Sequence, residues 1–197
     1  MTTPPRVLLL VAHPNPSSLN HALARAATEA LEEGGVRVDL HDLYREGFDP
    51  RLSAGEIATH ASDDAVVEAH VRELRAADAL VVIHPVWFDQ PPAILSGWVQ
   101  RVVREGDAFE HAPEGGFRGL LPAQDALVVT TQNAPYVPPD ALDHYWRSFV
   151  LPAVGIDDAE RIALGPVVAS DGATRRGWLE DVAARCDALA GRLTARA

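Results

Sequence analysis

Short apolar runs alternate along the chain with segments whose apolar residues recur at helical spacing. The runs at residues 7–12, 36–40, 79–84, 126–131 and 161–167 predict five strands, of which the first reads as buried on both faces and the third as buried. Helical spacing predicts helices over residues 19–33, 64–77, 92–103, 140–150 and 174–194. Strand and helix therefore follow each other five times.

Two connections interrupt this rhythm. Residues 45–59 form a long, irregular connection with a turn signal at Asp49-Pro50, and residues 105–122, with four glycines and two prolines, predict a long loop. The β-α alternation predicts one α/β domain over residues 1–197, a doubly wound five-stranded parallel sheet with helices on both faces. Ligands of such sheets bind at the carboxyl ends of the strands.

Composition excludes several kinds of function. The net charge is -11, which disfavours a nucleic-acid surface or an anionic membrane as partner. The chain has no lysine, which excludes a P-loop and a Schiff-base site. Its one cysteine, Cys186, excludes an internal disulfide. Neither a membrane span nor a signal peptide is visible, so we expect a cytoplasmic protein.

The first strand ends in the polar turn "AHPNPSSLN", residues 12–20. It lacks the G-x-G-x-x-G pattern of a nicotinamide dinucleotide site. Ser17, Ser18 and Asn20 instead place hydroxyls and an amide at a helix start, where the helix dipole favours an anion. The sequence predicts phosphate binding here, with a serine that only caps the helix as the alternative.

Two further strand ends carry candidate ligand groups. Trp87 and Phe88 follow the third strand, either as a stacking surface for a planar ligand or as lids packed on a helix. The polar loop Thr130, Thr131, Gln132 and Asn133 follows the fourth. Phosphate donors, aromatics and amides at neighbouring strand ends suit a flavin nucleotide.

The chain resembles the flavodoxin-like NAD(P)H:quinone oxidoreductases, the DT-diaphorase group and its bacterial relatives. Ala12-His13, "SLN" at 18–20, "PVWF" at 85–88 and above all "PAILSGW" at 92–98 carry the resemblance. It implies a flavodoxin-like sheet of order 2-1-3-4-5, a homodimer, and FAD, or alternatively FMN, reduced by NADPH or NADH. The implied flavin contacts are His13, Ser17, Ser18, Leu19, Asn20, Pro85, Val86, Trp87, Phe88, Thr130, Thr131, Gln132 and Asn133.

The resemblance implies ping-pong transfer of two electrons to a quinone, nitro or azo acceptor, with Tyr136 and His144 on the substrate side. One alternative is a non-catalytic regulatory subunit of the same fold. Another is a zinc-dependent deacetylase with A-H-P-D-D, but Asn15 and Pro16 replace both carboxylates, so we expect no metal site.

Overall fold

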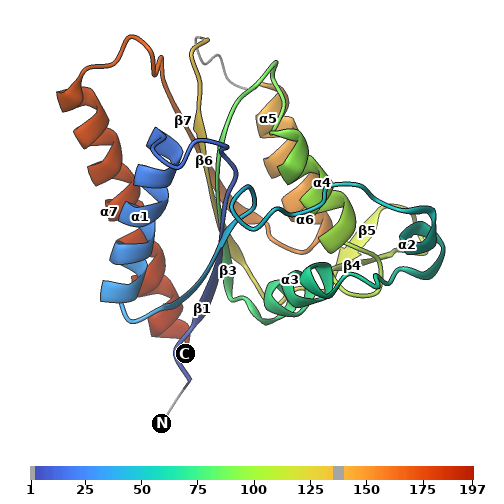
Figure 1. Ribbon diagram of the computed structural model, residues 1–197. Helices are drawn as coiled ribbons and strands as arrows, with labels where there is room; N and C mark the ends of the chain where they lie inside the picture. The colour runs from blue at the N-terminus through green and yellow to red at the C-terminus, as the bar shows by residue number, and fades with distance from the viewer. Residues whose placement is uncertain (1–2, 135–139) are drawn as a thin grey trace.

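A computed structural model describes residues 3–134 and 140–197 of the chain. Its main sheet holds five parallel strands in the order β2-β1-β3-β6-β7 (Figure 1). These are β1 (Arg6–Val11), β2 (Arg37–Asp42), β3 (Ala79–Pro85), β6 (Asp125–Thr131) and β7 (Asp158–Leu164). Counted among themselves, they have the order 2-1-3-4-5, so the predicted flavodoxin-like topology is confirmed.

Helices cover both faces of the sheet, as Figure 1 shows. On one face lie α1 (Leu19–Glu33) and α7 (Gly172–Arg196). On the other lie α3 (Ala65–Ala76), α4 (Ala93–Val102) and a helical segment made of α5 (Ala141–Asp143), the π-helix η1 (His144–Val150) and α6 (Leu151–Ala153). Alternate residues of β1 enter the two cores, Leu8 and Leu10 on one side and Val7 and Leu9 on the other. None of the described helices is long and apolar enough to cross a membrane.

The predicted fifth strand, residues 161–167, is displaced, because β7 runs from Asp158 to Leu164. Gly165 and Pro166 end the strand, joined by a cis peptide bond. A Cβ on Gly165 would lie 2.4 Å from the carbonyl oxygen of Gln132, and Pro166 has no N–H to donate. The regular ladder of β7 therefore ends at Leu164, although the Val167 amide still donates to the Gln132 carbonyl at 3.0 Å.

The two connections contain structure that the sequence reading missed. The predicted loop 105–122 holds a small hairpin of β4 (Phe109–His111) and β5 (Phe117–Gly119), and the rings of Phe109 and Phe117 meet edge to face. Gly115 and Gly116, both at positive φ, form its turn. In the other connection, α2 (Ala54–Thr59) begins with a capping box. Short elements like these carry too few periodic positions to be recognised.

The connection from β2 to α3 is held against α4. Gly97 faces Pro50 so closely that a Cβ on Gly97 would lie 2.3 Å from both the Cβ and the carbonyl oxygen of Pro50. One turn further on, the buried Arg101 donates to the Asp49 carbonyl at 2.6 Å and to the Glu56 carboxylate at 2.9 Å. The glycine of "PAILSGW" is therefore required by a backbone approach.

A histidine clamp fastens the other end of this connection. His41 contacts the carboxylates of Glu46 and Glu73 with its two ring nitrogens. Burial by itself would lower the pKa of His41, but the two carboxylates outweigh it and raise the pKa above 6.5. For Glu46, burial raises the pKa, but hydrogen bonds with His41 and His70 lower it to about 2.

This clamp has the spacing of a metal site, since ligand atoms of His41, Glu46 and His70 lie within 4.8 Å of one another. The Trp98 indole N–H, however, donates to Nδ1 of His70 at 2.8 Å. An indole nitrogen can only donate, so the proton of neutral His70 is on Nε2, facing Glu46 at 3.3 Å. With Nε2 protonated, His70 serves as a donor here and offers no lone pair to a metal.

Gly97→Ala should lower the free energy of unfolding by about 1–3 kcal/mol, because the new methyl group clashes with Pro50. Gly191→Ala is the matched control at an exposed position of helix α7, where a Cβ meets nothing within 4 Å. This control should raise the free energy of unfolding by about 0.5–1 kcal/mol. Denaturant unfolding measures both, and equal stability of Gly97→Ala and wild type would contradict the close approach.

The His41 clamp predicts a pH dependence of stability. Because the folded pKa of His41 is raised, protonated His41 stabilises the fold below its unfolded pKa. That contribution is lost as the pH rises from 6.5 through the raised value. Urea unfolding across this range should show the decline in wild type, a flatter profile in His41→Gln, and an unchanged decline in the control His144→Gln. A parallel decline in all three would exclude His41 as the cause.

Candidate functional site

Hydrogen bonds join three strand ends at the carboxyl edge of the sheet. The buried side chain of Asn20, in the first turn of α1, donates to Oγ1 of Thr131 at 2.9 Å. The Val86 amide, just after β3, donates to the Thr131 carbonyl at 2.8 Å. The rings of His13 and Trp87 lie 6.1 Å apart. The ends of β1, β3 and β6 are therefore one contiguous surface.

The turn after β1 orders its donors through its own side chains. Nδ1 of His13 accepts from the Asn15 amide at 3.0 Å, and Oδ1 of Asn15 accepts from the Ser17 amide at 2.9 Å. Burial lowers the pKa of His13 below 6.5, and the nearby His21 lowers it further. Neutral His13 therefore carries its proton on Nε2, as a hydrogen-bond donor without charge.

Ser18 caps helix α1, as the alternative reading of this serine predicted. Its Oγ accepts from the His21 amide at 3.3 Å and contacts Nδ1 of His21 at 2.8 Å. Nε2 of His21 faces Asp42 at 2.9 Å and donates to that carboxylate, so the Ser18 hydroxyl proton is directed to Nδ1. The groups left for an anion are the exposed Ser17 and the amides of Leu19 and Asn20, which have no carbonyl partner within the helix.

Trp87 to Gln90 form a tight turn after β3. Trp87 and Gln90 exchange backbone hydrogen bonds of 3.1 and 3.0 Å, and Phe88 and Asp89 between them have φ values of 52° and 56°. Non-glycine residues pay about 1–3 kcal/mol each for such strained conformations. Phe88 is fully exposed and Trp87 is 40% exposed. The alternative that Phe88 is a lid packed on a helix is wrong in this chain.

The last residues of β6 and the polar loop after it are held largely by their own side chains. The Thr130 hydroxyl donates to the Ile162 carbonyl at 3.2 Å and accepts from Arg161 at 3.1 Å. The side-chain amide of Gln132 donates to the Ala134 carbonyl at 3.0 Å. Oδ1 of Asn133 accepts from the backbone amide of Val168 at 2.9 Å. In this structure these side chains shape the loop, and their predicted flavin contacts stay predictions.

Of the two predicted substrate-side residues, the structure describes only His144. Tyr136 lies outside the described residues. His144 is exposed at the start of η1, and no contact among the described residues links its side chain to the three strand ends.

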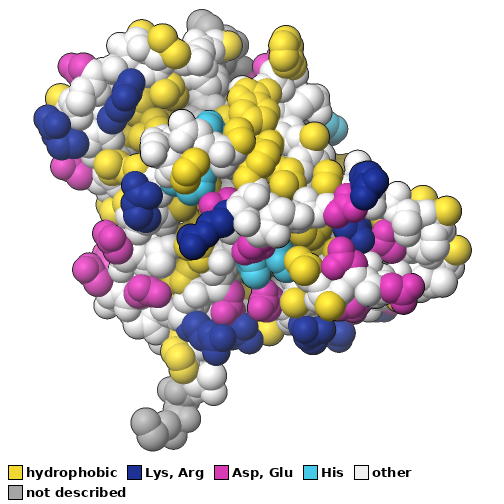
Figure 2. Space-filling model, viewed as in Figure 1, with side chains coloured by type: hydrophobic (Ala, Val, Ile, Leu, Met, Phe, Trp, Pro, Cys, Tyr) yellow, Lys and Arg dark blue, Asp and Glu magenta, His cyan; other side chains and the backbone are white. Residues whose placement is uncertain are grey.

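Sequence reasoning missed a cavity of about 580 Å³ beside the turn after β1. It is lined by His13, Pro14, Pro16, His21, Arg25, Asp42, Tyr44 and Arg45. On the face shown in Figure 2, histidine side chains gather near the middle, beside arginine and acidic side chains. The available signal was the segment from His41 to Arg45, which follows the second predicted strand, because that strand also ends at the carboxyl edge.

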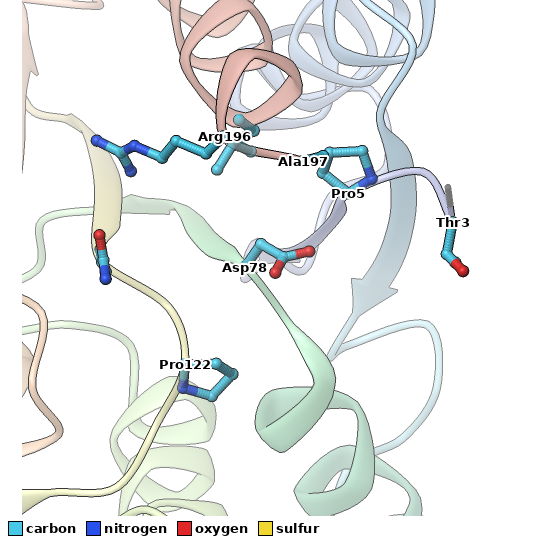
Figure 3. A pocket seen from close by; sticks show the side chains of 8 residues that line it. Thr3, Pro5, Asp78, Pro122, Arg196 and Ala197 are labelled. Carbon is cyan, nitrogen blue, oxygen red and sulfur yellow. The ribbon is translucent and has the colours of Figure 1, made fainter. Parts of the chain in front are cut away.

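Another cavity, of about 410 Å³, lies at the opposite edge of the sheet between the two chain ends (Figure 3). Asp78, just before β3, and Arg196, in the last turn of α7, are among the residues that line it. It is therefore separate from the carboxyl edge.

Comparison of the chain with known proteins identifies the family to which it belongs. Residues 5–186 match a family model described as having the flavodoxin-like fold. A ribosyldihydronicotinamide dehydrogenase-like protein of Penicillium crustosum is 40% identical over 152 residues, which are 64% of this chain and 57% of that protein. The match therefore spans little more than half the length of that relative.

Two solved structures extend the comparison. An NAD(P)H:quinone oxidoreductase from Methanothermobacter marburgensis superposes with a TM-score of 0.78 at 26% identity, covering 95% of this chain and 98% of that one. An FMN-dependent NADH-azoreductase from Bacillus anthracis in complex with FMN shares the fold, with a TM-score of 0.75 at 15% identity, covering 96% and 99% of the two chains. The chain therefore belongs to the flavodoxin-like fold family, as its sequence resemblance predicts.

Proposed function

We propose that this chain is a flavin-dependent oxidoreductase that transfers two electrons from NADPH or NADH to a quinone or azo compound. One observation carries the proposal. Amide donors at the start of α1 and the exposed aromatic turn after β3 share one surface at the carboxyl edge of the sheet. Phosphate and a flat ring are the two parts of a flavin nucleotide, and the names of the two solved structures agree with this chemistry.

The residues present fit such a cofactor. The amides of Leu19 and Asn20 and the Ser17 hydroxyl would hold its phosphate, with neutral His13 as a further donor. Trp87 and Phe88 would border the ring and exclude water from it. A bound flavin supplies reversible hydride acceptance, so the chain needs to bind and orient rather than provide an acid.

The cavity beside the turn favours FAD over FMN. His13, Pro14 and Pro16 belong to both the turn and the cavity, so the space continues directly from the proposed phosphate-binding groups. Arg25 and Arg45, both exposed, add two positive charges to its wall. A second phosphate and an adenosine would occupy this space, whereas FMN has neither.

The exposed turn also favours a dimer. Phe88 is fully exposed, and an apolar ring held in a strained turn is stabilised when it is buried. We propose that a second copy of the chain covers this turn and completes the substrate site.

Purified protein should be yellow, or should gain flavin absorbance when titrated with FAD or FMN. The bound holoprotein should then oxidise NADPH or NADH with a quinone or azo dye, giving parallel lines in double-reciprocal plots. Flavin binding without turnover would support the regulatory-subunit alternative. A chain that binds neither flavin would contradict the proposed function.

The double variant Arg25→Ala/Arg45→Ala should bind FAD about tenfold more weakly, because hydrogen bonds to charged groups are worth about 1.5–3 kcal/mol. Its affinity for FMN should stay within about twofold, since the arginines lie beyond the first phosphate. Fluorescence titration of the apoprotein measures both constants. Arg37→Ala, an exposed arginine at the amino end of β2, is the control. Equal losses for both flavins would exclude the cavity as the adenosine site.

A further inference from the structure

His84 is a fully buried histidine at the end of β3. Nδ1 lies 2.8 Å from the Pro85 carbonyl oxygen, and Nε2 lies 3.0 Å from the indole nitrogen of Trp146. A carbonyl only accepts and an indole nitrogen only donates, so Nδ1 carries the proton and Nε2 the lone pair. Burial lowers the pKa of His84 to about 4, and the charge of Arg161 adds to this effect. His84 is therefore a neutral imidazole with one defined tautomer.

The proton on Nδ1 holds one end of a particular peptide group. The Pro85 carbonyl accepts from His84, and the Val86 N–H of the same peptide donates to the Thr131 carbonyl at 2.8 Å. The two hydrogen bonds act on opposite ends of one planar unit, so they fix its rotation. One further peptide, Val86–Trp87, separates this peptide from the strained turn that begins at Trp87.

Trp146 selects the tautomer that makes this possible. It is 1% exposed and belongs to η1, in the helical segment that follows the fourth strand of the sheet. If its N–H were removed, the proton of His84 could move to Nε2, and the Pro85 carbonyl would lose its donor. Trp146 lies in a π-helical turn. Such turns are rare in proteins, and those that occur are often found at functional sites.

We propose that His84 is a positioning residue, which with Trp146 clamps the Pro85–Val86 peptide and so sets the strand end that borders the flavin ring. The proposal rests on the proposed function, because it assigns the ring to this edge. His84 itself does not touch the reacting atoms. His84 acts by orienting the Pro85–Val86 peptide, and the orientation of this peptide sets the direction of the turn that follows.

The first test follows the peptide directly. In His84→Leu, which removes the donor at similar volume, the Val86 amide should exchange with solvent about tenfold faster or more. His84→Asn, which keeps an N–H near the position of Nδ1, should restore protection to within about threefold. Nitrogen NMR of wild type should show His84 protonated on Nδ1 only, with no titration between about pH 5.5 and pH 8.

The second test follows the cofactor. FAD and FMN affinity of the apoprotein should fall about tenfold in His84→Leu and in Trp146→Phe, and much less in His84→Asn. Trp98→Phe is the matched control, because it removes the same kind of indole-to-histidine hydrogen bond at His70, away from the strand end. It should lower stability while leaving flavin affinity and Val86 exchange unchanged.

Equal flavin losses in Trp98→Phe and Trp146→Phe, or unchanged Val86 exchange in His84→Leu, would overturn the positioning role. A wild-type chain that binds neither flavin would overturn the proposed function and the flavin part of the inference with it. The exchange rates and the tautomer would still decide whether His84 clamps the peptide.

Discussion

The candidate site depends on Thr131, a buried residue whose hydroxyl and carbonyl hold two other strand ends. Its Oγ1 accepts from Asn20 at the start of α1, and its carbonyl accepts from Val86 after β3. Parallel strands bring their carboxyl ends to one edge, but only such cross-connections set the distances between loops that follow different strands. Without the Thr131 hydroxyl, the start of α1 would lose its side-chain hydrogen bond to the end of β6.

Around this junction the chain uses neutral donors with assigned protons. His13 and His84 both have lowered pKa values, and each has one ring nitrogen occupied by a backbone group, the Asn15 amide in one case and the Pro85 carbonyl in the other. In the proposed function, a chain without lysine that carries a net charge of -11 would meet the flavin phosphate with helix amides, the Ser17 hydroxyl and the His13 N–H group. Among the described residues, Arg25 and Arg45 line the cavity beyond the turn, whereas Arg161 donates to Thr130 inside the fold.

Strain at the aromatic turn is supported by the rigid structure before it. Phe88 and Asp89 hold left-handed conformations that favour glycine, and the turn starts one peptide after the Pro85–Val86 peptide, which is bound at both ends. In α4, which follows the aromatic turn, Gly97 allows the β2–α3 connection to pack closely on the helix. The His41 clamp holds the start of that connection. These contacts hold the backbone on both sides of the aromatic turn.

The sequence by itself determined the sheet, the main helices and the edge that carries the candidate site. The reason is that the spacing of apolar residues along the chain reflects which side of each strand or helix is buried. Helix 19–33 and the three central strands agree with the structure to within one residue at either end. The displaced strand β7, the β4–β5 hairpin and helix α2 depended on close approaches and short turns, for which periodicity has no signal. Only the tertiary structure decided that Ser18 caps a helix, that the Thr130 hydroxyl is used inside the fold, and that His84 is a neutral clamp. Each of these roles is set by a partner distant in the chain or by the direction of one hydrogen bond, and neither can be read from residue type and spacing.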